Sequence, residues 1–485
     1  MKKINILCLS ILLMTGCGDF LDEDLKGQIV GNASLSTVEG LDAALVGAYK
    51  GLASTWSTGF LHATAIGATM GGDDVTTHAA SNKQEFREFD QFSVSAANSR
   101  TGNLYNGCYK TIQGANNILN NYQLTKGDQT RINTIVGEAY FLRALSYFWL
   151  VRLYGSMPLI TTAEFSKDLL TIGKSEPVEI YALIEADLLN AEELLQDTKR
   201  DPGRPNKGSA KALLAEVYIT QGGWPIKNVS KYALAAAKAK EVIDNKATYG
   251  FDLMPTFTEV FDNDPAVATL PEYVFQISAF RGVWHTTNTS YGNGAMPGEE
   301  SGWDDYFSEI NFFNNFPAGP RKDATFRTQF KLSDGTIIPW QQSQTKHPYF
   351  GKFWIKGDVK SYESSLPFVM MRYAHVLTIY AEAKARSGGP DQQAYDALNA
   401  LRIRSGLAPL NGLSAEDFAK AVITERAWEF AGERTRWFDL VRLEMVEEAN
   451  ANKHPDDLKP INAITKEDYV FPLPLSETLA NPNLN

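Results

Sequence analysis

The most regular hydrophobic pattern in the chain lies between Gly137 and Leu159. Apolar residues recur there at the i, i+3, i+4, i+7 and i+8 positions of a helix, at Tyr140, Phe141, Ala144, Leu145, Phe148, Trp149 and Leu153. Leu142 and Val151 place further apolar groups on the other side. A helix that is apolar on more than one side must be covered by several neighbours. The pattern therefore predicts a buried central helix that ends at Gly155.

Helical spacing recurs in two blocks. The first block spans residues 36–245, and its periodicity predicts helices over 36–53, 103–122, 129–154, 177–196, 208–222 and 230–245. The second block and its tail span 372–485, with helices expected over 372–386, 391–404, 415–432 and 434–448. Antiparallel helix pairs of these lengths are typical of tetratricopeptide repeats, whose period is about 34 residues. The prediction is a mainly α fold with a tetratricopeptide-like scaffold of helical hairpins, although no clean self-match at that period is present.

Two stretches lack helical periodicity. Residues 54–102 are rich in Gly, Ser, Thr, Asn and Asp, which predicts a long loop. Residues 246–371 are rich in Gly, Pro, Asn and aromatic residues, and we expect a loop-rich insert between the helical blocks. Its short strands are predicted at 273–278, 326–332 and 336–340, the last two joined by a hairpin turn. Because binding residues concentrate on loops, we expect the function to lie in these stretches.

The N-terminus has the residue pattern of a signal peptide. Lys2 and Lys3 form a basic region, an apolar run follows over Ile4–Met14, and small residues precede Cys17. This order is typical of a bacterial lipoprotein signal over residues 1–16, cleaved before a Cys17 that then carries lipid, with residues 17–35 as a polar tether. The alternative is an ordinary secretory peptide cut nearby. No later apolar run reaches the ~20 residues that a membrane span needs, so we expect attachment through the lipid.

Charge and cysteine content narrow the possible functions. The 485-residue chain has a formal charge of −11, and loss of residues 1–16 leaves 44 basic and 57 acidic side chains, a charge of −13. This balance argues against nucleic acid as a partner, because phosphate binding needs a concentrated basic surface. Cys108 is then the one remaining thiol, on an apolar helical face, and we expect it to be buried and inert.

Several segments resemble the SusD/RagB-type surface lipoproteins. The pattern R-A-x-x-Y-F-x-L-V-x-x-Y-G-x-x-P-L is matched from Arg143 to Leu159. Five further matches follow in the expected order, at KGSAKALLAEVYI (207–219), MMRYAHVLTIYAEAKAR (370–386), LNALRIRSGL (398–407), ITERAWEFAGERTRWFDLVRL (423–443) and FPLPLSETLANPNLN (471–485). The resemblance covers the chain from the lipidated cysteine to the last residues.

The resemblance implies a glycan-binding lipoprotein on the surface of the outer membrane. Such a protein captures an oligosaccharide and delivers it to a SusC-like TonB-dependent transporter, and needs neither a catalytic group nor a cofactor. Two alternatives remain. The chain is a gating lid for a transporter of a non-sugar nutrient such as a peptide, or it is a surface glycoside hydrolase.

The resemblance also implies that ligand contacts come from Gly71–Asn103 and Ser278–Phe353. The acidic pair Asp73 and Asp74 follows two glycines and can accept sugar hydroxyls, or alternatively forms a turn or a helix cap. The candidate stacking rings lie among Gly, Asn and Pro, where exposure is expected, and are Trp284, Tyr291, Trp303, Tyr306 and Trp340. The alternative for each ring is local packing.

Arg321, in GPRKDATF, completes the candidate ligand residues, with bracing of the insert through Asp323 or Glu299 as its alternative. For the charged residues of the 423–443 segment we expect ion pairs within and between helices, at Glu425, Arg426, Glu429, Glu433, Arg434, Arg436 and Asp439. Arg143 and Arg152 are expected to satisfy buried carboxylates or carbonyls.

Enzymatic functions find little support in the sequence. The six histidines show no H-E-x-x-H or other metal-ligand spacing, so no metal site is expected. No G-x-S-x-G nucleophile motif is present. Four carboxylates of the insert could supply a glycosidase pair, Glu299, Glu300, Asp304 and Asp305, but nothing in the sequence places them around a sugar. We therefore predict a binding protein.

Overall fold

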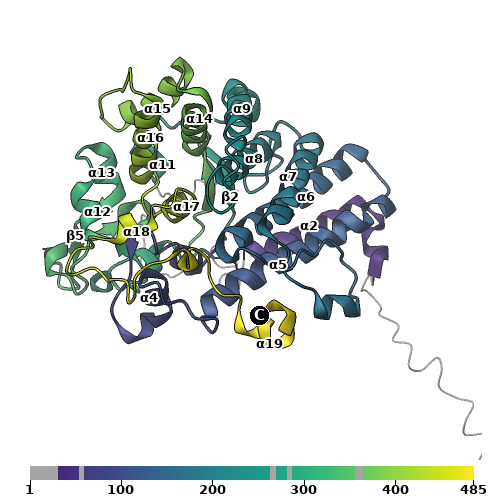
Figure 1. The fold of residues 1–485 in the computed structure, drawn as a ribbon, viewed down its shortest axis with the longest axis horizontal. Coiled ribbons are helices and arrows are strands. Elements are labelled where there is room, and N and C mark those ends of the chain that lie inside the picture. The colour runs from purple at the N-terminus through teal and green to yellow at the C-terminus, as the bar shows by residue number, and fades with distance from the viewer. Residues whose placement is uncertain (1–30, 54–58, 263–268, 281–286, 356–363) are drawn as a thin grey trace, which may run out of the picture.

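The computed structural model describes residues 31–53, 59–262, 269–280, 287–355 and 364–485. The long helices of its first part are α2 (Val38–Leu52), α5 (Ser99–Asn121), α6 (Gln129–Tyr154), α7 (Pro177–Leu194), α8 (Lys207–Gln221) and α9 (Lys231–Asp244). Those of its second part are α14 (Tyr373–Gly388), α15 (Gln392–Arg404) and α16 (Ala415–Glu429). Each long helix of the first part packs on the next, and α9 packs on α14, so the two blocks form one continuous array (Figure 1). The predicted mainly helical fold is confirmed.

The central helix lies where the pattern placed it. The α6 helix has the predicted bounds of 129–154 and contacts α2, α5, α7 and α8, so its several apolar sides are all covered. It ends at Gly155, whose φ of 67° favours glycine. Arg143 donates to both carboxylate oxygens of Asp187 at 2.8 and 2.7 Å, and Arg152 pairs with Glu216 at 3.1 Å. Both arginines satisfy carboxylates, as expected, of which Asp187 is buried and Glu216 is partly exposed.

Two predicted segments differ from the structure. The helix expected over 434–448 is broken into α17 (Thr435–Arg442) and α18 (Val446–Asn450), because Glu444 between them has a φ of 57°. The stretch expected as a long loop contains α3 (Thr64–Gly67) and α4 (Gln84–Asp90). The α4 helix buries Phe86 and Phe89, but its seven residues are too few to show a helical period.

Short antiparallel strands and helices make up the insert. The hairpin predicted around residue 334 is confirmed, with β5 (Gln329–Lys331) paired to β6 (Ile337–Pro339). The remaining pairs join distant segments and are β1 (Val75–Thr76) with β3 (Phe307–Ser308), β2 (Tyr273–Ile277) with β8 (Phe368–Arg372), and β4 (Phe326–Arg327) with β7 (Tyr349–Phe350). The short helices of the insert and tail are α10 (Lys246–Tyr249), α11 (Phe257–Val260), α12 (Ile310–Asn315), α13 (Pro320–Thr325) and α19 (Leu475–Ala480).

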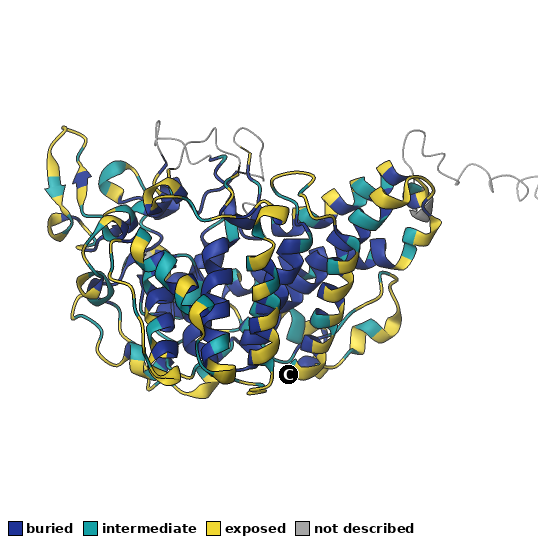
Figure 2. Ribbon diagram, turned by 90° about the horizontal axis from the view of Figure 1, so that it is seen from above, coloured by how far each residue is buried: buried dark blue, intermediate teal, exposed yellow. Residues whose placement is uncertain are grey.

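The core is continuous through helices and insert. Buried residues line the inner sides of the helices, and exposed residues gather at their outer sides and ends (Figure 2). Cys108 lies in this core, as predicted, and burial raises the pKa of its thiol to about 12. Within the described ranges, no helix combines the length and the apolar character that a membrane crossing requires.

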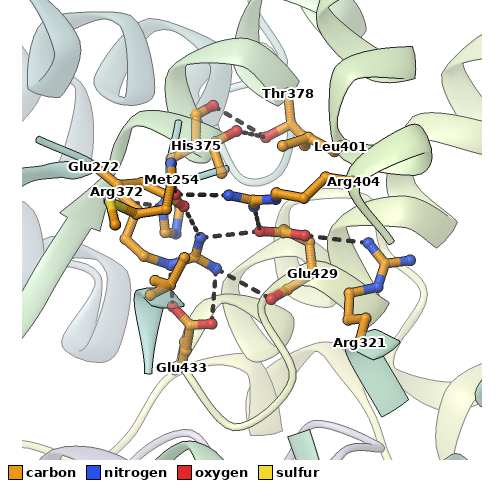
Figure 3. Close-up of polar contacts among 12 residues, drawn as sticks. Met254, Glu272, Arg321, Arg372, His375, Thr378, Leu401, Arg404, Glu429 and Glu433 are labelled. Atoms are coloured by element: carbon orange, nitrogen blue, oxygen red, sulfur yellow. Dashed lines mark hydrogen bonds and ion pairs between the residues drawn. The ribbon is translucent and has the colours of Figure 1, made fainter. Parts of the chain in front are cut away.

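A buried network of charges joins the insert to the second helical block (Figure 3). Arg372, at the end of β8, contacts Glu272, Glu429 and Glu433, while Arg404 of α15 bonds to Glu272 and Glu429 at 2.6 Å each. Burial alone would raise the pKa of Glu433, but the charges of Arg372 and Lys352 outweigh it and lower this pKa to about 2. Glu433 is therefore ionised at neutral pH.

We predict that Arg372→Met destabilises the protein by about 3 kcal/mol or more, because it leaves three buried carboxylates short of a partner. Urea unfolding followed by circular dichroism measures the change. The control is Lys240→Ala, which breaks the exposed pair between Lys240 and Asp244 and should have no measurable effect. Equal stability of Arg372→Met and the wild type would show that the network is dispensable.

Candidate functional site

Two loop regions that are more than 200 residues apart in sequence meet at the β1–β3 pair. Beside it, the Thr77 hydroxyl donates to the carbonyl of Asp305 at 2.8 Å, and Lys83 forms an ion pair with the Asp305 carboxylate. The backbone N–H of Thr289 donates to the carbonyl of Leu61 at 2.8 Å. We call this region the loop junction, formed by residues 59–62, 75–83 and 98–100 on one side and 287–305 on the other. It joins the two regions that the sequence predicted to hold the ligand contacts.

The loop junction is rich in polar groups. Arg100 stacks on Phe86, with 3.6 Å from its guanidinium carbon to the ring centroid. Burial, together with the charges of Arg100 and Lys83, lowers the pKa of His62 to about 4. His62 is therefore neutral at pH 7, and its Nδ1 lies 3.4 Å from the Thr64 hydroxyl.

Of the predicted tryptophans, one lies in the loop junction and a second lies near it. Trp303 is half-buried within the loop junction and directly precedes Asp304, whose carboxylate accepts from the Tyr349 hydroxyl at 2.5 Å. Tyr349 belongs to a small aromatic cluster with Phe307 and Phe330, and the partly buried Trp340 packs against that cluster. Trp284 lies outside the described residues. Tyr349 thus contacts Asp304, the neighbour of Trp303 in the chain, and belongs to the cluster against which Trp340 packs.

Sequence reasoning missed a further exposed ring. Trp354 is 39% exposed, and the guanidinium carbon of Arg327 lies 4.7 Å from its ring centroid. Arg327 is held in place by the Glu300 carboxylate, at 2.6 and 2.8 Å. Trp354 directly follows the predicted ligand-binding range, which ended at Phe353. Its chain neighbours are Phe353 and Ile355, so the local sequence gave no signal of exposure.

Two of the predicted stacking rings are packed in the protein interior. The ring of Tyr291 is buried and stacks on Phe353, with 4.7 Å between the centroids. Tyr306 is 1% exposed and donates its hydroxyl to the carbonyl of Ser290 at 2.7 Å. Neither ring offers a face to solvent, so the local-packing alternative describes both.

Arg321 is 2% exposed and braces the insert, but through different partners from those expected. It bonds to Glu425 at 2.6 Å and to Glu429 at 3.1 Å, not to Asp323 or Glu299. These partners lie on α16, more than 100 residues away, where local spacing gives no signal. The ion pairing predicted for the 423–443 segment is confirmed by these contacts and by Arg426 with Asp439, whereas Arg434 donates to the backbone carbonyl of Val369 at 2.7 Å.

The two acidic candidates have different surroundings. Asp73 is partly exposed and forms a two-bond ion pair with Arg436, at 2.6 and 2.8 Å, in a cleft away from Trp303 and Trp340. Asp74 is 2% exposed, and its carboxylate accepts from the backbone N–H of Gly432 at 2.8 Å. Burial, reinforced by the charge of Asp73, raises the pKa of Asp74 to about 7. Asp74 thus ties the first loop region to the turn after α16.

Comparisons with known proteins agree with this architecture. A family model described as "SusD family" matches residues 324–485, and one described as "Starch-binding associating with outer membrane" matches residues 19–219. The chain is 30% identical to SusD-like protein P2 of Formosa agariphila, over 100% of this chain and 99% of that protein.

Solved structures show the same similarity. A SusD superfamily protein from Parabacteroides distasonis matches with a TM-score of 0.79 at 26% identity, over 92% of this chain and 98% of that one. A laminarin-binding SusD-like protein matches with a TM-score of 0.74 at 25% identity, over 91% of this chain and 97% of that one.

We predict that Asp74→Asn alters the pH dependence of stability. The pKa of Asp74 is about 7 in the folded chain and about 4 in the unfolded chain, so only the folded chain keeps the proton between these pH values. Protonation of Asp74 stabilises the folded chain fully below about pH 4, and this stabilisation is lost as the pH rises to about 7. The stability of Asp74→Asn relative to the wild type should therefore rise by up to about 1.4 kcal/mol per pH unit over that range. Urea unfolding across the range tests this, and a pH-independent difference would contradict it.

Proposed function

The chain belongs to the SusD family, and from that premise we propose that it is a surface lipoprotein that binds an oligosaccharide. It delivers this ligand to a SusC-like TonB-dependent transporter in the outer membrane. The family-model description of starch binding at the outer membrane and the laminarin-binding structural neighbour support the ligand class and the location. The anchor in this proposal is the lipid on Cys17, which lies outside the described residues.

The observation that carries the proposal is the loop junction. Sugar rings present apolar C–H faces and hydroxyl edges, so a binding site for them combines aromatic rings with a few fixed polar groups. The β1–β3 pair brings such groups together from two distant loop regions, with His62 and Arg100 on one side of the loop junction and Trp303 on the other. Trp340 and Trp354 extend this surface over the insert.

The contacts of the insert carboxylates favour binding over hydrolysis. A glycosidase needs one carboxyl group as an acid and another as a base or nucleophile beside the sugar. Here Glu300 is paired with Arg327 and Asp305 with Lys83. Asp304 accepts from Tyr349, and Glu299 accepts from the Gln344 N–H at 2.6 Å. All four carboxylates thus already serve structural contacts, and we propose a chain without catalytic activity.

We predict that Trp303→Ala and Trp340→Ala each weaken oligosaccharide binding about tenfold or more, because each removes a stacking surface of at least about 1.4 kcal/mol. Isothermal titration with laminarin, xyloglucan and starch oligosaccharides measures the affinity. Trp284→Ala belongs to the same series.

The control is Phe165→Ala, which removes a 74% exposed ring of the first helical block and should leave binding unchanged. Unchanged affinity in all three tryptophan variants would contradict the placement of the site. Failure of the wild type to bind any of these sugars, with uptake still dependent on the chain, would favour the gating-lid alternative.

A further inference from the structure

A large hollow lies beside α16. It is a surface cleft of about 1300 Å³, larger than the range of about 300–1,000 Å³ that is common for small-molecule sites. One side of α16 runs along its base, from Ala415 through Ala419 and Ile423 to Trp428. The walls come from α12, α18 and the segments at the start of α9 and the end of α14. A cleft of this size and length accommodates an extended ligand.

The α12 helix separates this cleft from the aromatic surface of the insert. Phe313 points toward the insert, with its ring centroid 6.0 Å from that of Trp340 and 5.1 Å from that of Phe326. Its neighbours Asn311, Phe312 and Asn315 line the cleft. The two surfaces therefore lie on different sides of one helix, and the cleft is distinct from the loop junction.

The charges that line the cleft are balanced. Four basic side chains, Arg386, Lys420, Arg436 and Lys453, face four acidic ones, Asp73, Glu309, Glu416 and Glu448. Three ion pairs already form among them: Arg436 with Asp73, Lys453 with Glu309 and Lys420 with Glu416. A lining without net charge favours neither an anionic nor a cationic ligand, and so suits a neutral polar one.

The remaining lining groups have the chemistry that sugars need. Trp428 and Phe312 are half-buried and supply aromatic surface from two sides of the cleft. Within the described part of the chain, the Asn315 amide and the Glu448 carboxylate have no side-chain partner, and both residues are exposed. Aromatic rings with nearby amide and carboxylate groups offer both stacking and hydrogen bonds to hydroxyls.

A partner helix fits this cleft less well. Helix-in-groove binding requires apolar pockets that take side chains at positions i, i+3 or i+4, and i+7. The apolar base here consists mainly of the small side chains of Ala415, Ala419 and Ala427, and Ile423 is already buried. This base supplies little apolar area for anchoring side chains.

We propose that this cleft is a second oligosaccharide-binding site, with Trp428 as its stacking ring and Asn315 and Glu448 as its hydrogen-bonding groups. Its ligand class rests on the proposed function, whereas its position is independent of the loop junction. A chain with two sites holds a polysaccharide at two points, which raises the avidity for a polymer above that for a short oligosaccharide.

Thr424→Trp tests the proposal by filling the cleft. Thr424 lines the cleft, is exposed, and bonds through its hydroxyl only to the Lys420 carbonyl in the same helix, so the substitution should leave the fold intact. Gln392→Trp, on the exposed surface at the start of α15, is the matched control. Isothermal titration uses short oligosaccharides of laminarin, xyloglucan and starch with the full-length chain.

The expected result is two oligosaccharides per wild-type or control chain and one per Thr424→Trp chain. In the Trp303→Ala, Trp340→Ala double variant, the remaining binding should weaken at least tenfold when Thr424→Trp is added. The same stoichiometry and affinity in Thr424→Trp and the control would overturn the second site and leave the proposed function standing. Binding lost in Thr424→Trp but kept in the double variant would support the cleft and overturn the loop junction. A wild type that binds none of the probes would overturn both.

Discussion

The ion pairs of Arg372 are the constraint on which the rest of the structure depends. Its guanidinium lies at the end of β8 and reaches Glu272 beside β2, Glu429 at the end of α16 and Glu433 in the turn that follows. Buried charges are costly unless each one is paired, so the three segments must keep their relative positions. Through this group, the irregular insert is held against the helical array.

The turn after α16 links the ion pairs of Arg372 to the loop junction. Glu433 in this turn pairs with Arg372, while the neighbouring Gly432 donates its N–H to Asp74. Gly432 has a φ of 74°, and an added Cβ would approach the ring of Phe350 to 2.9 Å. The position therefore requires glycine on two grounds. One short turn thus fixes both the charge network and the first loop region, and it presents the polar groups of the loop junction in a fixed arrangement.

The sequence predicted the helical scaffold well because long helices carry a repeated signal. The apolar pattern from Tyr140 to Leu153 covers about four turns of α6, and Gly155 marks the end of this helix. The β1 strand has two residues, and its partner strand lies more than 200 residues away, so no local sequence pattern predicts it. The candidate site was harder to predict for the same reason. Tyr291 and Tyr306 lie among residues typical of exposed loops, but this loop folds back onto the core and buries both rings. The composition of a segment indicates whether it is typical of a loop, but the burial of its side chains depends on contacts with distant segments.

Hydrogen–deuterium exchange with and without a bound oligosaccharide tests the central claim most directly, because it reports where the ligand orders the backbone. The account predicts slower exchange in residues 59–62, 75–83, 98–100 and 287–305, which form the loop junction beside the β1–β3 pair. A saturating oligosaccharide that leaves the exchange of all these segments unchanged would contradict it.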